Sequence, residues 1–458
     1  MSSPTNHGAD RRLWNPTVET MSADALRALQ LERLKKQVAY NFERSEFFRT
    51  KFAAAGAVPR DIRSFEDFAL LPLMDKQEHR TAQAESIERF GNPFELMNCA
   101  RIDEVVRINA TSGTSGVPTF YALTAHDVAV VNEMHARKYW RAGIRPGHIM
   151  LQALSLSMFT GGLPLSQGIQ HLGAAVVPVG IEGGTLRVLE HIALLRPQAI
   201  IATPSFGQYL IEQAPHVAGK PAAALGIEYF FCAGEPGGGI LSVRQSLAEG
   251  FGAKVFDHTG GGHAFHGISR EEPAGQYSGM YFVSPDHCLL ELIDPSSRLP
   301  MAIEDGAKGE MVITFLDWQG GPFMRYAFGD IIEVATSPCP QGWPGLRFKV
   351  VGRSDDMLIV KGVNVFPQAI QGVIASFQPR LTGHFRVRLK SPGPLVRPPL
   401  RLAVERGAGT AESDLPAIEA ELRERMAREL RVRPEIVWLA PEALPRESRK
   451  VRLVEIEP

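Results

Sequence analysis

The feature of this sequence that most constrains its fold is an alternation of short apolar runs with helical segments, which begins near residue 105. Runs that are apolar on both faces are typical of strands in a sheet covered on both sides, and the helices between them supply the cover. We therefore predict an α/β fold with mixed sheets covered by helices. Val105–Ile108 is the first expected strand, and the expected buried strands are Ile149–Leu151, Ala175–Val179, Ala199–Ile201 and Tyr229–Phe231.

Helical spacing is clear in two further places. Leucines recur every three to four residues from Leu26 onwards, and Ser22 stands where the N-cap of that helix is expected. His126–Arg141 predicts a second helix, after the first strand. The structure should therefore begin with a helix before the sheet starts.

A domain boundary is expected near Arg353. The preceding Gly342–Gly345 is a turn signal, and the roughly 100 residues that follow have the size of a small domain. They carry strands and a charged helix from Leu415 to Leu430. We predict a large N-terminal domain at 1–352 and a small α+β domain at 353–458.

Composition excludes several classes of partner. The 458 residues carry a formal net charge of -1, so no overall field attracts nucleic acid or an anionic membrane. No apolar run approaches the roughly 18 residues of a membrane span, and Met1–Arg12 lacks the apolar core of a signal peptide. The four cysteines stand far apart. We expect a reduced, cytoplasmic protein with no nucleic-acid or membrane partner, and a homodimer stays open.

The loop Thr111–Gly116 contains only small and hydroxyl-bearing residues and follows an expected strand. Glycines allow a backbone to approach a ligand closely, and successive amides and hydroxyls can bind phosphate oxygens. No Gly-Lys-Ser/Thr follows, so this is not a Walker A loop. Composition alone leaves a phosphate loop and a plain surface turn equally open.

Extended to Thr119, this loop resembles the phosphate loop of the adenylate-forming superfamily, in the form found in phenylacetate–coenzyme A ligases. The resemblance covers almost the whole chain, and Gly352–Pro367 is its most specific part. Other stretches similar to that family, in family order, are Leu13–Pro16, Phe159–Leu163, Thr203–Ser205, Gly234–Pro236 and Arg325–Asp330.

The resemblance implies an ATP site. The β- and γ-phosphates would lie on the loop, and Asp330 would accept hydrogen bonds from the ribose hydroxyls. Arg353 would approach the nucleotide. The complete set of expected ATP-binding residues is Thr111, Ser112, Gly113, Thr114, Ser115, Gly116, Gly234, Glu235, Pro236, Asp257, Asp330 and Arg353.

The resemblance also implies a mobile lid formed by the small domain. Asp355 would be its hinge, because a residue that is not β-branched tolerates a large backbone change. Lys450, in a Pro-Arg-containing C-terminal segment, would be the catalytic lysine that steadies the α-phosphate. The tunnel for coenzyme A would be lined by Lys361, Gly362 and Val363, and the acid pocket by Phe159, Gly161 and Gly261.

One loop departs from the family pattern. Aligned on Gly260, it has Gly262 in place of a hydroxyl residue and His263 in place of a glutamate that normally helps to hold Mg²⁺. Imidazole is a poor ligand for magnesium. Mg²⁺ held by phosphates and water alone, direct contact of a catalytic His263 with phosphate or acid, and impaired adenylation all stay open. His258, His263 and His266 also suggest a metal site or a basic lining, but no metal ligand is assigned.

These expectations define an acid–thiol ligase. ATP would activate a carboxylic acid, aromatic or cyclic by resemblance, to an acyl-AMP, and coenzyme A would then accept the acyl group. The expected cofactors are ATP, Mg²⁺ and coenzyme A. Two alternatives stay open: a stand-alone adenylating enzyme that loads a carrier protein or another nucleophile, and a nucleotide-binding protein with impaired ligase activity.

Overall fold

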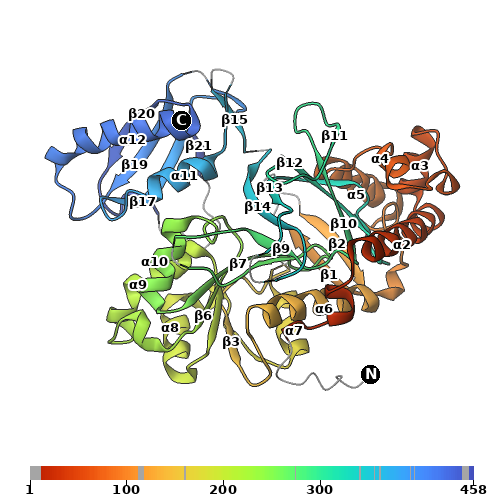
Figure 1. Cartoon of the computed structure of the whole chain (residues 1–458), viewed down its shortest axis with the longest axis horizontal. Helices are drawn as coiled ribbons and strands as arrows, with labels where there is room; N and C mark the ends of the chain where they lie inside the picture. Colours follow the sequence, from red (N-terminus) through yellow and green to blue (C-terminus); the bar gives the residue numbers. More distant parts are fainter. Residues whose placement is uncertain are drawn as a thin grey trace.

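The computed structural model describes residues 12–111, 118–158, 161–273, 275–339, 342–354, 356–360, 363–391, 393–396, 398–445 and 453–457. Within these residues the largest sheet has twelve strands, in the order β11-β10-β12-β13-β14-β9-β8-β7-β6-β5-β3-β4. Figure 1 shows helices packed around it. Its strands are β3 (Ile149–Gln152), β4 (Ala175–Pro178), β5 (Ala199–Ala202), β6 (Tyr229–Cys232), β7 (Lys254–Thr259), β8 (Gly267–Ser269), β9 (Met280–Phe282), β10 (Cys288–Ile293), β11 (Pro300–Met301), β12 (Lys308–Phe315), β13 (Tyr326–Ala335) and β14 (Arg347–Arg353).

The sheet changes character at β7. Strands β4, β3, β5, β6 and β7 pair in parallel. Beyond β7 the order is β8, β9, β14, β13, β12 and β10, and all of these neighbours pair antiparallel. Helices follow the parallel strands and cover both faces, which is why β5 is buried at every residue. The helices of this body are α1 (Pro16–Glu19), α2 (Ala23–Arg44), α3 (Glu46–Ala54), α4 (Phe65–Ala69), α5 (Lys76–Phe90), α6 (Ala125–Arg141), α7 (Leu163–Leu172), α8 (Gly184–Leu195), α9 (Pro204–Val217) and α10 (Leu241–Phe251).

Short 3₁₀ turns connect several of these elements. They are η1 (Pro59–Asp61), η2 (Ile102–Glu104), η3 (Ile181–Gly183) and η4 (Ala222–Leu225).

The predicted cap of the first long helix is confirmed, since the Ala25 N–H donates to Ser22 Oγ at 3.3 Å. The predicted second helix is confirmed as α6, where Thr124 and Asp127 form a capping box.

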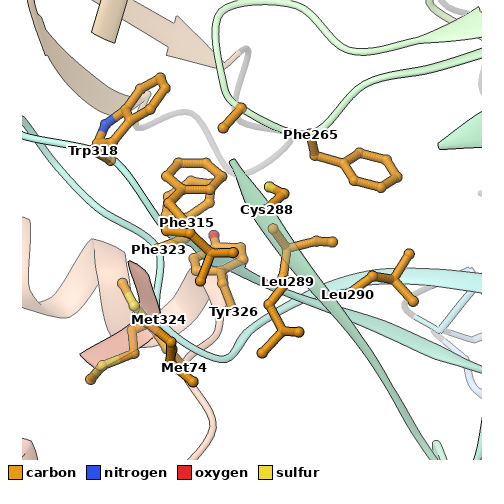
Figure 2. Packing of buried hydrophobic residues seen from close by; sticks show 14 of the residues in the cluster. Met74, Phe265, Cys288, Leu289, Leu290, Phe315, Trp318, Phe323, Met324 and Tyr326 are labelled. Atoms are coloured by element: carbon orange, nitrogen blue, oxygen red, sulfur yellow. The ribbon is translucent and has the colours of Figure 1, made fainter. Parts of the chain in front are cut away.

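The antiparallel half packs on an aromatic core. Figure 2 shows Phe315, Phe323 and Tyr326 close together beside Met74 and Met324. The Phe323 ring stacks on that of Tyr326 with the centroids 4.2 Å apart. This cluster joins α2–α4 to β10, β12 and β13, so these N-terminal helices are part of the same body as the sheet.

One strand prediction is confirmed and one is corrected. The expected strand at Val105–Ile108 is β1 (Val105–Thr111), which forms a separate hairpin with β2 (Thr119–Thr124), and Val106 is 63% exposed. The sequence alternates there, and only one face of the hairpin is covered. The expected buried strand at Ala175–Val179 is β4, an edge strand with exposed ends, because it pairs with β3 alone.

The C-terminal unit has its own hydrophobic core, built from residues such as Ile370, Val387 and Leu422. Its charged helix lies where the sequence predicted it. In Figure 1 the unit sits beside α9 and α10. Its elements are β15 (Leu358–Val360), β16 (Val363–Val365), α11 (Pro367–Ala375), β17 (Leu381–Leu389), β18 (Leu395–Val396), β19 (Leu400–Arg406), η5 (Glu412–Asp414), α12 (Leu415–Leu430), β20 (Pro434–Leu439) and β21 (Val454–Ile456).

Two contacts hold this unit against the body. Ala375 of α11 joins the hydrophobic cluster that contains Val243 and Leu247 of α10. Phe366 lies directly over Gly352, where an added Cβ would stand 2.3 Å from the phenyl ring. None of the helices described here combines the length and apolar character needed to cross a membrane.

Candidate active site

The predicted site residues that the structure describes come from the ends of several strands. Thr111 ends β1, Gly234–Pro236 follow β6, and the Gly260 loop follows β7. Asp330 and Arg353 lie on the adjacent strands β13 and β14. The carboxyl ends of parallel strands are the usual position of a ligand crevice in such a sheet. Ten predicted residues lie outside the described residues: Ser112, Gly113, Thr114, Ser115, Gly116, Phe159, Asp355, Lys361, Gly362 and Lys450.

Asp330 and Arg353 form an ion pair across β13 and β14. They are register partners, and Arg353 Nη1 donates to Asp330 Oδ1 at 2.7 Å. Arg353 Nη2 also donates to the Phe328 carbonyl at 3.2 Å. Both side chains are about a quarter exposed, so this pair adds little stability. Its effect is to hold a carboxylate and a guanidinium side by side at the surface of the site.

Glu235 has a local structural partner. Its Oε1 accepts a hydrogen bond from the Ser205 N–H at 2.7 Å, in the first turn of α9. A carboxylate there satisfies a free helix N–H and interacts favourably with the helix dipole. The side chain thus joins the turn after β6 to α9. Contacts to an adenine would then come from the backbone around Gly234, whose φ is +85°.

Asp257 lies under the glycine turn after β6. Tyr277 donates its hydroxyl to Asp257 Oδ2 at 2.6 Å, and burial raises the pKa of this aspartate. A Cβ on Gly238 would stand 2.6 Å from Asp257 Oδ1, so only glycine lets this turn approach the carboxyl group. Tyr277 was not predicted, and nothing in the sequence near it indicated this role.

The backbone of the Gly260 loop is held by α6. Lys138 Nζ donates to the carbonyls of Thr259 and Gly260, at 3.1 and 3.2 Å. His135 Nε2 lies 3.1 Å from the carbonyl of Gly261. Both side chains are completely buried. Sequence reasoning missed them, although a lysine three residues after a histidine on a largely apolar helix face was a usable sign.

The histidines of the loop are neutral and serve its backbone. His258 Nδ1 lies 2.8 Å from the Cys232 carbonyl, and His266 Nε2 lies 2.7 Å from the His263 carbonyl. Burial lowers the pKa of both rings well below the usual value for histidine, and Lys138 lowers it further. They therefore make no basic lining. Among the described residues, no cluster of histidine, cysteine and acidic side chains has the arrangement of a metal site.

His263 stands at the predicted position of the family glutamate. Its Nδ1 accepts a hydrogen bond from the Phe265 N–H at 3.2 Å, so the proton of the neutral ring is on Nε2. Burial lowers the pKa of His263 to about 4. The ring centroid lies 5.8 Å from that of Phe328, two residues before Asp330. His263 thus packs a neutral side chain against Phe328, whose carbonyl accepts from Arg353.

The turn at Gly161 is fixed in a similar way. Gln152, at the end of β3, donates Nε2 to the carbonyls of Gly161 and Gly162, at 3.3 and 2.9 Å. Ser166 in turn donates to Gln152 Oε1 at 2.6 Å.

Of the remaining predicted residues, Val363 pairs with Val360 in the C-terminal unit. Arg325, part of the stretch expected near the ribose, is buried, and its Nε contacts Glu291 at 3.2 Å.

The chain is similar to known AMP-binding enzymes and ligases. A profile described as the AMP-binding enzyme C-terminal domain matches residues 362–455. The phenylacetate–coenzyme A ligase of Thermus thermophilus is 33% identical over 457 residues, covering 96% of this chain and 99% of the relative.

The solved structures of 2-hydroxyisobutyryl-CoA ligase also match. The post-adenylation state with R3-HIB-AMP has a TM-score of 0.87 at 27% identity, covering 98% of this chain and 93% of that chain. The thioesterification state with 2-HIB-AMP and CoA has a TM-score of 0.69 at 27% identity, covering 99% and 94%.

The resemblance on which the site was predicted is therefore confirmed, and so is the predicted enzyme class, an AMP-forming acid–CoA ligase. With 33% identity over almost its whole length, the chain belongs to the phenylacetate–coenzyme A ligase family of adenylate-forming enzymes.

Proposed function

We propose that this protein activates a cyclic or aromatic carboxylic acid, with phenylacetate as the first compound to test. The reaction class follows from the family: ATP and the acid give an acyl-AMP, and coenzyme A takes the acyl group. The observation that carries the site assignment is that the Gly260 loop contacts both Phe328, whose carbonyl accepts from Arg353, and Asn109, two residues before Thr111.

The chemistry has two displacements. A carboxylate oxygen of the acid bonds to the α-phosphorus of ATP, and the bond to pyrophosphate breaks. The thiolate of coenzyme A then bonds to the acyl carbon, and AMP leaves with the electrons of the acyl–oxygen bond. Negative charge grows around phosphorus in the first step, so fixed donors and cations there lower its barrier. Arg353 is the described cation of that kind, and Asp330 would hold the ribose hydroxyls.

The Gly260 loop does not fit a magnesium ion. The carbonyls of Thr259, Gly260 and Gly261 accept from Lys138 and His135, and His263 Nδ1 accepts from the Phe265 N–H. Magnesium prefers oxygen ligands in octahedral geometry. We infer that Mg²⁺ enters with ATP as part of the substrate, held by phosphate oxygens and water.

A swinging lid is also part of the proposal. The C-terminal unit has a separate core, and the chain fits the post-adenylation structure better than the thioesterification structure of the same relative. We propose that residues 353–458 turn about Asp355 between the two steps. Lys450 would serve adenylation, Lys361, Gly362 and Val363 would guide coenzyme A, and Phe159, Gly161 and Gly261 would shape the acid pocket.

The test is a panel of aromatic and cyclic acids with ATP, Mg²⁺ and coenzyme A, read by mass spectrometry for acyl-CoA. Phenylacetyl-CoA, or another cyclic acyl-CoA, is the expected product. An acyl-AMP that never becomes a thioester would indicate another acceptor, such as a carrier protein. The absence of acid-dependent pyrophosphate exchange with every acid would contradict the proposed function.

A further inference from the structure

The orientation of three successive peptide groups in the Gly260 loop is set from one side. Lys138 and His135 are three residues apart, so both project from the same face of α6. Between them they bind the carbonyls of Thr259, Gly260 and Gly261. All three carbonyls therefore point toward α6.

The N–H groups of the same peptides must point the other way. In a planar trans peptide the C=O and N–H bonds are opposed, so the N–H groups of Gly260, Gly261 and Gly262 face away from α6. No acceptor for any of the three exists among the residues that the structure describes. Gly261 and Gly262 are buried. Buried backbone N–H groups without acceptors are rare, and those of Gly261 and Gly262, next to the partly exposed one of Gly260, indicate a ligand.

Asn109 adds a fourth donor at the same place. It lies near the end of β1, two residues before the phosphate loop begins, and is 3% exposed. Its Nδ2 has no partner within the described part of the chain. A Cβ on Gly262 would stand 2.0 Å from that nitrogen, so the asparagine amide lies directly against the loop.

The donors lie where the family pattern is broken. Gly262 and His263 replace the expected hydroxyl and carboxylate residues, and the His263 ring is beside Phe328, whose carbonyl accepts from Arg353. We propose, resting on the function proposed above, that the amides of Gly260–Gly262 and Asn109 bind the anionic oxygens of the α-phosphate and the acid carboxylate. Lys138 and His135 are the positioning residues of this anion nest.

Lys138 suits this role for a second reason. No carboxylate lies within ion-pair distance of it among the described side chains, and its partners are carbonyl dipoles. A buried amine without a counter-ion is costly to protonate, and an anion bound across the loop would reduce that cost. Burial lowers the pKa of Lys138, so the chain places an amine whose protonation favours a bound anion behind the loop where the family places a glutamate for magnesium.

The experiment compares the binding of AMP and adenosine to the full-length protein by calorimetry. The two probes differ in the α-phosphate alone, so the ratio of their dissociation constants reports how well the protein binds that phosphate. In Lys138→Met we expect this ratio to fall about tenfold or more, with adenosine affinity unchanged. The side chains are similar in length, and thermal unfolding checks that the variant is folded.

A pair of variants at His135 provides the control. His135→Gln keeps an amide donor for the Gly261 carbonyl and should preserve the AMP preference, whereas His135→Leu should reduce it. A wild-type protein that binds AMP no better than adenosine would overturn the proposal. So would an unchanged ratio in both Lys138→Met and His135→Leu, or equal losses for both probes in folded variants. If Lys138→Met does not fold, the His135 pair decides.

These outcomes are separate from the fate of the proposed function. AMP and adenosine contain no acid, so a preference that depends on Lys138 supports the nest even if the acid panel yields no product. Acyl-CoA formation with an AMP preference that does not depend on Lys138 or His135 would support the function and reject the nest.

Discussion

Two basic side chains of the site are held in opposite ways. Arg353 is about a quarter exposed and is paired with the carboxylate of Asp330. Lys138 is completely buried and touches carbonyl oxygens instead. The first arrangement is charge-neutral and needs no ligand, whereas the second lacks an anion. The comparison teaches that this protein keeps one preformed, solvated ion pair and one buried amine whose pKa is lowered by burial and whose protonated form would find its counter-ion in the substrate.

Removing the paired cation should have the largest effect. In Arg353→Met we expect acid-dependent pyrophosphate exchange to fall by about 10²–10³-fold, because a donor to the nucleotide is lost and Asp330 loses its partner. The matched control is Arg388→Met, which breaks the 2.7 Å ion pair with Glu455 in the C-terminal unit. That change should alter the exchange rate by no more than about twofold. Equal losses of exchange rate in Arg353→Met and Arg388→Met would show that Arg353 supports the fold and does not act on the nucleotide.

Displacing α6, which carries Lys138, should have the next largest effect, here on stability. A Cβ on Gly168 of α7 would stand 2.2 Å from His135 Cβ, so Gly168→Ala must push α7 away from α6. Such overpacking costs about 1–3 kcal/mol of the free energy of unfolding, measured by chemical denaturation. Gly372→Ala is the control, since nothing lies within 4 Å of its added Cβ. It should stabilise α11 by about 0.5–1 kcal/mol.

Restoring the family carboxylate should change the metal requirement. In His263→Glu we expect the free Mg²⁺ concentration for half-maximal pyrophosphate exchange to shift by about threefold to tenfold, since an oxygen ligand replaces a ring nitrogen. The control His263→Gln introduces a neutral side chain and should leave this Mg²⁺ concentration near the wild-type value. An unchanged Mg²⁺ dependence in both variants would mean that position 263 does not face the phosphates.

The smallest effect concerns pH and stability. The pKa of His263 is lowered from 6.5 to about 4, so between these values the unfolded chain binds more protons than the folded one. The free energy of unfolding therefore falls as pH falls from 6.5 toward 4. His263→Gln should flatten this dependence, by less than about 1.4 kcal/mol per pH unit. The control is His216→Gln, at an exposed position. It should leave the change of the free energy of unfolding with pH, measured by denaturation at several pH values, as it is in the wild type.

The sequence predicted the parts of the site that come as short ordered motifs. Asp330 and Arg353 belong to such motifs, and the structure places them side by side. Lys138 and His135 belong to none. Their role depends on how α6 packs against a loop more than a hundred residues later, and helical periodicity gives no information on that contact.

In the fold, too, the sequence predicted some features and not others. Apolar runs identified β3, β5 and β6 because strands buried on both faces have no other pattern available. The same reasoning failed for β4, which was predicted to be buried and lies at the edge of the sheet, since an apolar run does not say how many neighbours a strand will have. Edge position and hairpin formation are properties of the whole sheet.

The packing of Ala375 against α10 has a thermal consequence. The lid motion that we propose must uncover this small apolar surface and the ring of Phe366 over Gly352. Exposing apolar surface to water raises the heat capacity, and the apolar attraction weakens on cooling. Lower temperature should therefore loosen the lid from its post-adenylation position. The relative speeds of the two half-reactions should depend on temperature even where the chemistry of each is unchanged.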